Sequence, residues 1–78
     1  MNFASAIFAL MRGQKIRRHH WIGYWYFDQK KRTVIMHMHD GEERDIRDAE
    51  DIIDTLSNCA ADDWEIVPEW QTPISEDI

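Results

Sequence analysis

Residues 33–47, TVIMHMHDGEERDIR, hold the strongest structural signal in the sequence. Asp40-Gly41 stands between two extended runs, and this dipeptide is typical of a two-residue type I′ hairpin turn because it tolerates positive φ. Such a loop would place His37 opposite Arg44 on the neighbouring strand. The second run is poor in β-formers and rich in charge, so we expect it to be an edge strand.

The residues on either side of this hairpin predict three more strands. Residues 21–28, WIGYWYFD, alternate with period two, so Trp25 would face one side of a sheet and Tyr24 the other. Residues 14–18, QKIRR, fit a short strand before this segment. Residues 64–67, WEIV, fit a last short strand.

Two further segments have helical character. The first, residues 3–12, FASAIFALMR, is rich in alanine, and a glycine follows it directly. Asp48 is predicted to cap a second helix that runs to about residue 57. The expected apolar face of the first helix consists of Phe3, Ile7, Leu10 and Met11. The expected buried stripe of the second consists of Ala49, Ile52, Ile53 and Leu56.

The order of these elements predicts an α+β fold. A helix, two strands, a hairpin, a helix and a strand indicate a small antiparallel sheet of about four to five short strands packed with two helices. We expect residues 1–68 to form this single domain. Residues 69–78 are acidic, contain a proline and lack periodicity, so we expect a mobile tail.

Composition excludes several classes of protein. The chain has 78 residues, of which 44% are hydrophobic and 31% charged, which is typical of a globular domain. Its net charge of −6 argues against binding to a nucleic acid polymer or to an anionic membrane. Cys59 is the only cysteine, which excludes an intrachain disulfide. Without a signal peptide or a transmembrane run, the expected location is the cytoplasm.

The sequence offers no convincing catalytic group. His37 and His39 would share one face of a strand, and Glu42 across the turn could provide a third metal ligand. Nothing completes that set, and Arg44 would place a cation beside the metal. Cys59 has no base near it in sequence, and no glycine-rich phosphate loop is present. We therefore expect a protein that is not an enzyme and needs no cofactor or metal.

A cluster of basic and aromatic residues instead suggests ligand binding. Its members are Arg17, Arg18, Trp21, Tyr24, Trp25 and Tyr26, with Lys30, Lys31 and Arg32 nearby. Guanidinium groups bind phosphate oxygens in pairs, and flat aromatic rings stack on bases. In an acidic chain, such a cluster favours a pocket for a small anionic nucleotide over a groove for a polymer. The alternative is that the tryptophans belong to the core and the basic residues lie on a solvated face.

Two parts of the chain resemble a known family. The first is NFASAIFALMRGQKIRRHHWIG, residues 2–23, and the second is ADDWEIV, residues 61–67. The hairpin and a short helix lie between them, as the family's order requires. Over residues 2–67 the chain resembles the phage-encoded Thoeris anti-defence proteins of the second type.

The resemblance implies a fold, an assembly and a function. Members of this family are small α+β protomers that form a dimer of dimers, with ligand pockets between protomers. They sequester a cyclic ADP-ribose isomer, the messenger of bacterial Thoeris immunity, without cleaving it, and some relatives sequester cyclic oligonucleotides. The protein would then act in the cytoplasm of an infected bacterium. By the same resemblance, Arg18 would bind phosphate, Trp21 would stack on adenine, and Asp63 with Trp64 would support the pocket wall.

A different function fits the charge of the chain. Acidic residues are dense from Glu42 to Asp54 and again in the tail. A small acidic phage protein could inhibit a host protein by direct binding to a basic surface.

Overall fold

A computed structural model of the chain describes residues 1–68, and the expected tail, residues 69–78, lies outside the described residues. The described part has two α-helices and one five-stranded antiparallel sheet, which confirms the predicted α+β class. The elements in chain order are α1 (Phe3–Met11), β1 (Ile16–Arg18), β2 (Tyr24–Asp28), β3 (Thr33–His37), β4 (Glu43–Asp45), the short 3-10 helix η1 (Ile46–Asp48), α2 (Ile52–Cys59) and β5 (Trp64–Ile66). Among residues 1–68, no helix is long and apolar enough to cross a membrane.

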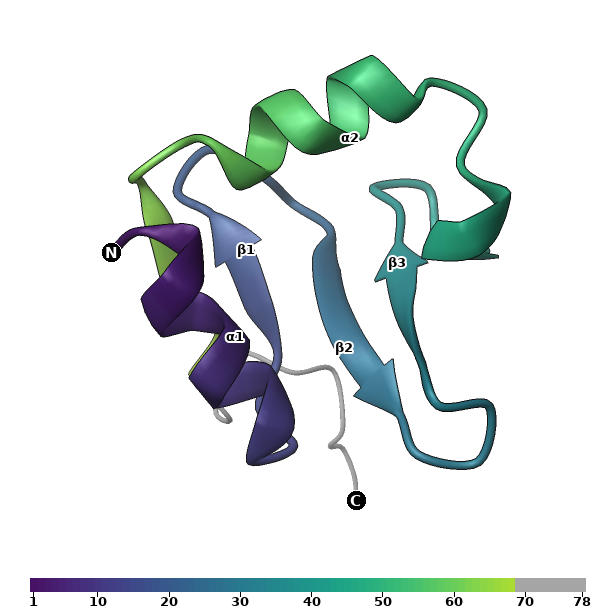
Figure 1. Cartoon of the computed structure of the whole chain (residues 1–78), viewed down its shortest axis with the longest axis horizontal. Coiled ribbons are helices and arrows are strands. Elements are labelled where there is room, and N and C mark those ends of the chain that lie inside the picture. Colours follow the sequence, from purple (N-terminus) through teal and green to yellow (C-terminus); the bar gives the residue numbers. More distant parts are fainter. Residues whose placement is uncertain (69–78) are drawn as a thin grey trace.

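The sheet has the strand order β4-β3-β2-β1-β5, so the last strand joins the first. Figure 1 shows α1 lying along the half of the sheet that contains β1, whereas α2 runs past the end of the sheet above β2 and β3. At the first residue of β5, the outer edge of the strand is hydrogen-bonded to the N-terminus of the chain. Trp64 donates its backbone N–H to the carbonyl of Met1 at 3.0 Å and accepts from the Met1 amino group at 2.7 Å.

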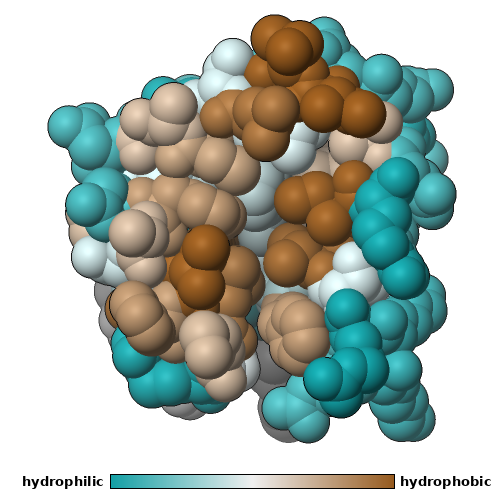
Figure 2. All heavy atoms as spheres, in the orientation of Figure 1, coloured by the Kyte–Doolittle hydropathy of each residue, from teal (hydrophilic) through white to brown (hydrophobic). Residues whose placement is uncertain are grey.

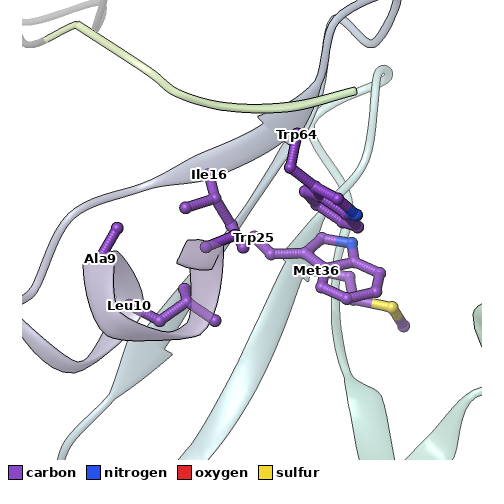
Figure 3. Packing of buried hydrophobic residues seen from close by; sticks show 7 residues of the cluster. Ala9, Leu10, Ile16, Trp25, Met36 and Trp64 are labelled. Atoms are coloured by element: carbon purple, nitrogen blue, oxygen red, sulfur yellow. The ribbon is translucent and has the colours of Figure 1, made fainter. Parts of the chain in front are cut away.

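The core lies between α1 and the sheet. Its members are Ala6, Ala9, Leu10, Ile16, Trp25, Met36 and Trp64 (Figure 3). Small alanines on the inner side of α1 allow the helix to approach the strands closely, and the two indoles fill the remaining volume. The predicted apolar face of this helix is therefore wrong in part, because Ile7 and Met11 are exposed while Ala6 and Ala9 are buried.

The hairpin between β3 and β4 is shifted by one residue from its predicted register. His37 pairs with Glu43, and Arg44 pairs with Met36. Because side chains alternate across a sheet, this shift moves Arg44 to the face that carries Met36 and Trp25. The predicted pairing of His37 with Arg44 is therefore wrong.

The turn explains the shift. The backbone N–H of Met38 donates to the carbonyl of Glu42 at 2.7 Å, which closes a loop of three residues rather than two. Gly41 has φ +90°, whereas Asp40 does not have positive φ. This is a type I turn followed by a left-handed glycine, the usual three-residue hairpin loop. The Asp-Gly pair located the turn but did not determine its type.

Candidate functional site

The part of the sheet that α1 leaves uncovered borders a hollow of about 730 Å³. The hollow lies between strands β2, β3 and β4 and the helix α2, and Figure 2 shows it as a recess among apolar side chains. Ligand pockets in proteins typically measure about 300 to 1,000 Å³. The hollow is therefore large enough for a mononucleotide or a small cyclic dinucleotide.

Antiparallel pairing builds the floor of the hollow. Met36 lies opposite Trp25 on one side and opposite Arg44 on the other, so the three side chains project from the same face of the sheet. Trp25 is almost fully buried and Met36 is buried. The floor is thus apolar at its centre and has a cation at its β4 side.

A group of tryptophans forms the wall beside β1. Trp21 lies 5.6 Å from Trp25 and 5.2 Å from Trp64 between ring centroids, the second pair in edge-to-face geometry. Trp64 is 1% exposed and donates its indole N–H to the backbone carbonyl of Asn58 at 2.9 Å. Trp21 is only half-buried and lines the hollow. Among these three tryptophans, Trp21 is the one whose indole a ligand can reach.

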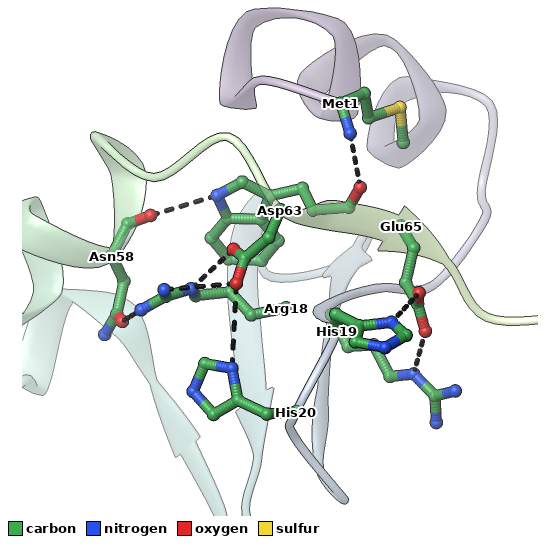
Figure 4. A network of polar contacts seen from close by, with 9 residues as sticks. Met1, Arg18, His19, His20, Asn58, Asp63 and Glu65 are labelled. Atoms are coloured by element: carbon green, nitrogen blue, oxygen red, sulfur yellow. Dashed lines mark hydrogen bonds and ion pairs between the residues drawn. The ribbon is translucent and has the colours of Figure 1, made fainter.

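Arg18 is held in place at the same wall. Its Nε and Nη2 donate to the two carboxylate oxygens of Asp63 at 2.8 and 3.2 Å, and its Nη1 donates to the Asn58 amide oxygen at 2.9 Å (Figure 4). The bond to Asp63 raises the pKa of Arg18 and lowers the pKa of Asp63. This fork links β1 to α2 and to the start of β5.

The structure brings together four of the seven predicted site residues. Arg18, Trp21, Tyr24 and Trp25 line the hollow. Tyr24 borders the hollow at the start of β2, but its side chain alternates with that of Trp25 and lies on the opposite face of the sheet. There its ring stacks on His37, with ring centroids 4.6 Å apart, and the Lys15 ammonium lies 4.7 Å from its centroid.

The other three predicted residues do not line the hollow. Arg17 lies one position from Arg18 in β1 and so points to the opposite face, where its Nε donates to Glu65 at 2.8 Å. Asp63 orients Arg18, and Trp64 is buried beneath Trp21. Asp63 and Trp64 thus support the wall from behind.

Sequence reasoning missed the contribution of α2. Asp51, Asp54, Thr55 and Asn58 line the hollow from this helix. Their spacing of i, i+3, i+4 and i+7 defines one helical face, and that regularity was a signal in the sequence. Arg44 was also missed as a lining residue, because its face depends on the hairpin register.

The apolar side of α2 points away from the hollow. Ile52, Ile53 and Leu56 are 64, 72 and 57% exposed, so the prediction that they are buried is wrong. The helix begins at Ile52, after the N-cap Asp51, rather than after Asp48. Asn58 bonds to Arg18 and Trp64 and thereby fixes the rotation of the helix, which turns its polar side inward.

Two other candidate chemistries gain no support in the described part of the chain. Within residues 1–68, no three His, Cys, Asp or Glu side chains are grouped so that they could hold a metal ion. The carboxylate that bonds to His37 is Glu43, at 3.0 Å, and Glu42 was the residue considered as a third metal ligand. Burial raises the pKa of the Cys59 thiol, which makes its thiolate scarce at neutral pH.

Acid is expected to destabilise the protein through the carboxylates near the hollow. Arg18 keeps the pKa of Asp63 below its unfolded value, so ionised Asp63 favours the folded state at neutral pH. That contribution is present above the unfolded pKa of about 4 and is lost as the pH falls through the folded value. Urea unfolding measured from pH 6 to pH 2 should show this decline. Asp63→Asn should make the decline shallower, and the part that remains comes from other carboxylates with lowered pKa values, such as Asp45 and Glu65. Asp62→Asn removes an adjacent charge that is not bonded to Arg18 and should keep the Asp63 contribution.

Comparison with known proteins gives no match: no family model, no curated protein and no solved structure matches this chain. A functional proposal therefore depends on the residues of the hollow and on the resemblance described above.

Proposed function

We propose that this protein binds and sequesters a small cyclic nucleotide in the hollow without cleaving it. The ligand class that fits the resemblance is a cyclic ADP-ribose isomer, and cyclic oligonucleotides are the nearest alternative. The role would be to block Thoeris immunity in the cytoplasm of a bacterium infected by a phage. The observation that carries this proposal is the half-buried Trp21 on the wall of a hollow of about 730 Å³.

The chemistry of the lining supports such a ligand. A purine can stack on Trp21, and base–aromatic stacking contributes about 1 to 3 kcal/mol per base. Arg18 and Arg44 place guanidinium groups at the two sides of the floor, so the hollow carries positive charge that can attract a phosphate. Sequestration requires affinity alone, so the hollow can act without an acid, a base or a nucleophile.

We also propose that the protein acts as a homo-oligomer, in the form of a dimer of dimers. Two helices leave apolar side chains uncovered in the described chain. On α1 these are Ile7, Phe8 and Met11, and on α2 they are Ile52, Ile53 and Leu56. Apolar side chains gathered on helix faces in this way favour contact with another protein surface.

The second candidate function is inhibition of a host protein by direct binding. The same exposed apolar face of α2 favours it, because uncovered apolar surface of this kind is typical of protein contacts and the chain as a whole has a net charge of −6. A basic, apolar surface on a host protein would complement it. Purification from host cells distinguishes the two functions: a stoichiometric host protein supports inhibition, and a copurified nucleotide supports sequestration.

Thermal unfolding with added cyclic ADP-ribose isomers tests the main proposal. A ligand at 100 times its Kd stabilises the folded state by about 2.7 kcal/mol, which corresponds to a rise in Tm of about 10 °C or more in a domain of this size. Adenosine at the same concentration serves as the control without phosphate and should produce a smaller rise. An unchanged Tm with every isomer, at concentrations far above micromolar, would refute sequestration.

A further inference from the structure

We infer that the ligand's anionic group binds at Arg44, and that Glu50 occupies this guanidinium as a displaceable counter-ion in the free protein. The inference deepens the proposed function and rests on it. It assigns the anion contact to β4 rather than to Arg18, the arginine that the resemblance indicates.

The two arginines of the hollow differ in how firmly they are paired. Arg18 uses three of its five N–H groups on Asp63 and Asn58, and its side chain is only 24% exposed. These bonds hold β1, α2 and β5 together. A ligand that displaced them would disrupt the wall of its own binding site, so Arg18 serves chiefly as part of the framework.

Arg44 has looser and more exposed partners. Its Nη1 lies 3.2 Å from a carboxylate oxygen of Glu50, whose side chain is 86% exposed. Its Nη2 lies 3.6 Å from Glu42, which is beyond hydrogen-bond distance. Exposed ion pairs of this kind contribute little to stability. A phosphate can accept two hydrogen bonds from the Arg44 guanidinium. It can therefore replace Glu50 at small cost to the stability of the fold.

The position of Arg44 suits a ligand whose base lies against the tryptophans. Arg44 is opposite Met36, which is opposite Trp25, so two strand spacings separate the strand of Arg44 from the strand of Trp25. The Trp21 ring, on which the base would stack, packs against Trp25 at 5.6 Å between centroids. At about 4.8 Å per spacing, this distance is about 10 Å between strands. That is on the scale of one nucleotide, with its base on the wall and its phosphate at β4.

Negative charge on α2 favours one orientation of the ligand in the hollow. Asp51 and Asp54 line the hollow from the helix and repel an anion there. The positive side of the hollow is the floor, where Arg44 projects beside Met36. A phosphate is thus directed to the floor, and the neutral face of the sugar or base is directed towards α2.

Calorimetric titration of four proteins tests this anion subsite. The wild type, Arg44→Gln and Glu50→Gln are titrated with cyclic ADP-ribose and, separately, with adenosine. Arg47→Gln is the matched control, because Arg47 is exposed, pairs with Asp45 and does not line the hollow. Circular dichroism and thermal unfolding verify that each variant is folded.

The expected results have opposite signs. Arg44→Gln should weaken cyclic ADP-ribose binding by about 10- to 100-fold, the loss typical of a hydrogen bond to a charged group, while adenosine binding changes little. Glu50→Gln should strengthen cyclic ADP-ribose binding by about two- to fivefold, because the competing carboxylate is gone. Arg47→Gln should bind both ligands as the wild type does.

Two outcomes separate the subsite from the function on which it rests. If the wild type binds cyclic ADP-ribose and Arg44→Gln binds it equally well, the subsite is refuted and sequestration stands. If the wild type binds neither cyclic ADP-ribose nor its isomers, sequestration itself is refuted. A loss of adenosine affinity equal to the loss of cyclic ADP-ribose affinity in Arg44→Gln would also overturn the subsite, since the change would not concern the phosphate.

Discussion

The Gly23→Ala variant is expected to lose about 3 kcal/mol of unfolding free energy, the upper part of the range for overpacked sites. Gly23 is buried just before β2, and an added Cβ would penetrate the carbonyl oxygen of His37. The obstacle is backbone, which cannot rotate away as a side chain can. A domain of this size has a total stability of about 5 kcal/mol, so the variant should unfold at a much lower urea concentration.

Gly13→Ala is the matched control for this substitution. A Cβ at Gly13 meets no atom within 4 Å, but its φ of +86° is unfavourable for alanine. This strain costs about 1 to 2 kcal/mol. Urea unfolding of both variants should therefore place Gly23→Ala clearly below Gly13→Ala. Equal midpoints would contradict the close approach of β2 and β3 at the rim of the hollow.

Trp21→Ala is expected to weaken the binding of every ligand that carries a base. Loss of one stacking partner costs about 1 to 3 kcal/mol, or about 5- to 150-fold in Kd. The effect should appear with adenosine as well as with cyclic ADP-ribose, because the base rather than the phosphate contacts the indole. This pattern distinguishes Trp21 from Arg44, whose loss should affect only the phosphate-bearing ligand.

Truncation of Trp21 also removes contacts with Trp25 and Trp64, so stability needs its own control. Trp21→Phe keeps an aromatic face at the wall and should retain most of the affinity. Phe27→Ala changes another partly exposed aromatic residue, one that does not line the hollow, and should bind within about threefold of the wild type, since surface contacts away from the site contribute little. Normal binding by a folded Trp21→Ala protein would mean that the base does not stack there.

Sequence patterns were sufficient for the elements but not for every register. Helix and strand periodicity predicted two helices and the antiparallel sheet, because local patterns determine both. The β3–β4 register failed because Asp40-Gly41 is compatible with either a two-residue or a three-residue loop. One additional loop residue moved Arg44 to the face that borders the hollow.

The candidate site was predictable only where it follows from local alternation. Arg18 lies in β1 and Trp21 lies just before β2. Both line the hollow, as the cluster of aromatic and basic residues in the sequence indicated. The inward face of α2 was not predictable from its amphipathic pattern, which favours burial of Ile52 and Leu56. Asn58 accepts hydrogen bonds from Arg18, 40 residues earlier, and from the Trp64 indole, and helical periodicity encodes neither bond. These two bonds determine the orientation of the helix.

The most direct measurement is native mass spectrometry of the wild-type protein mixed with cyclic ADP-ribose and its isomers. We expect an oligomer that carries a mass increment equal to the intact ligand, with the ligand recovered unaltered after release. A protein that remains free of every isomer, or a ligand that is recovered in hydrolysed form, would contradict capture without cleavage.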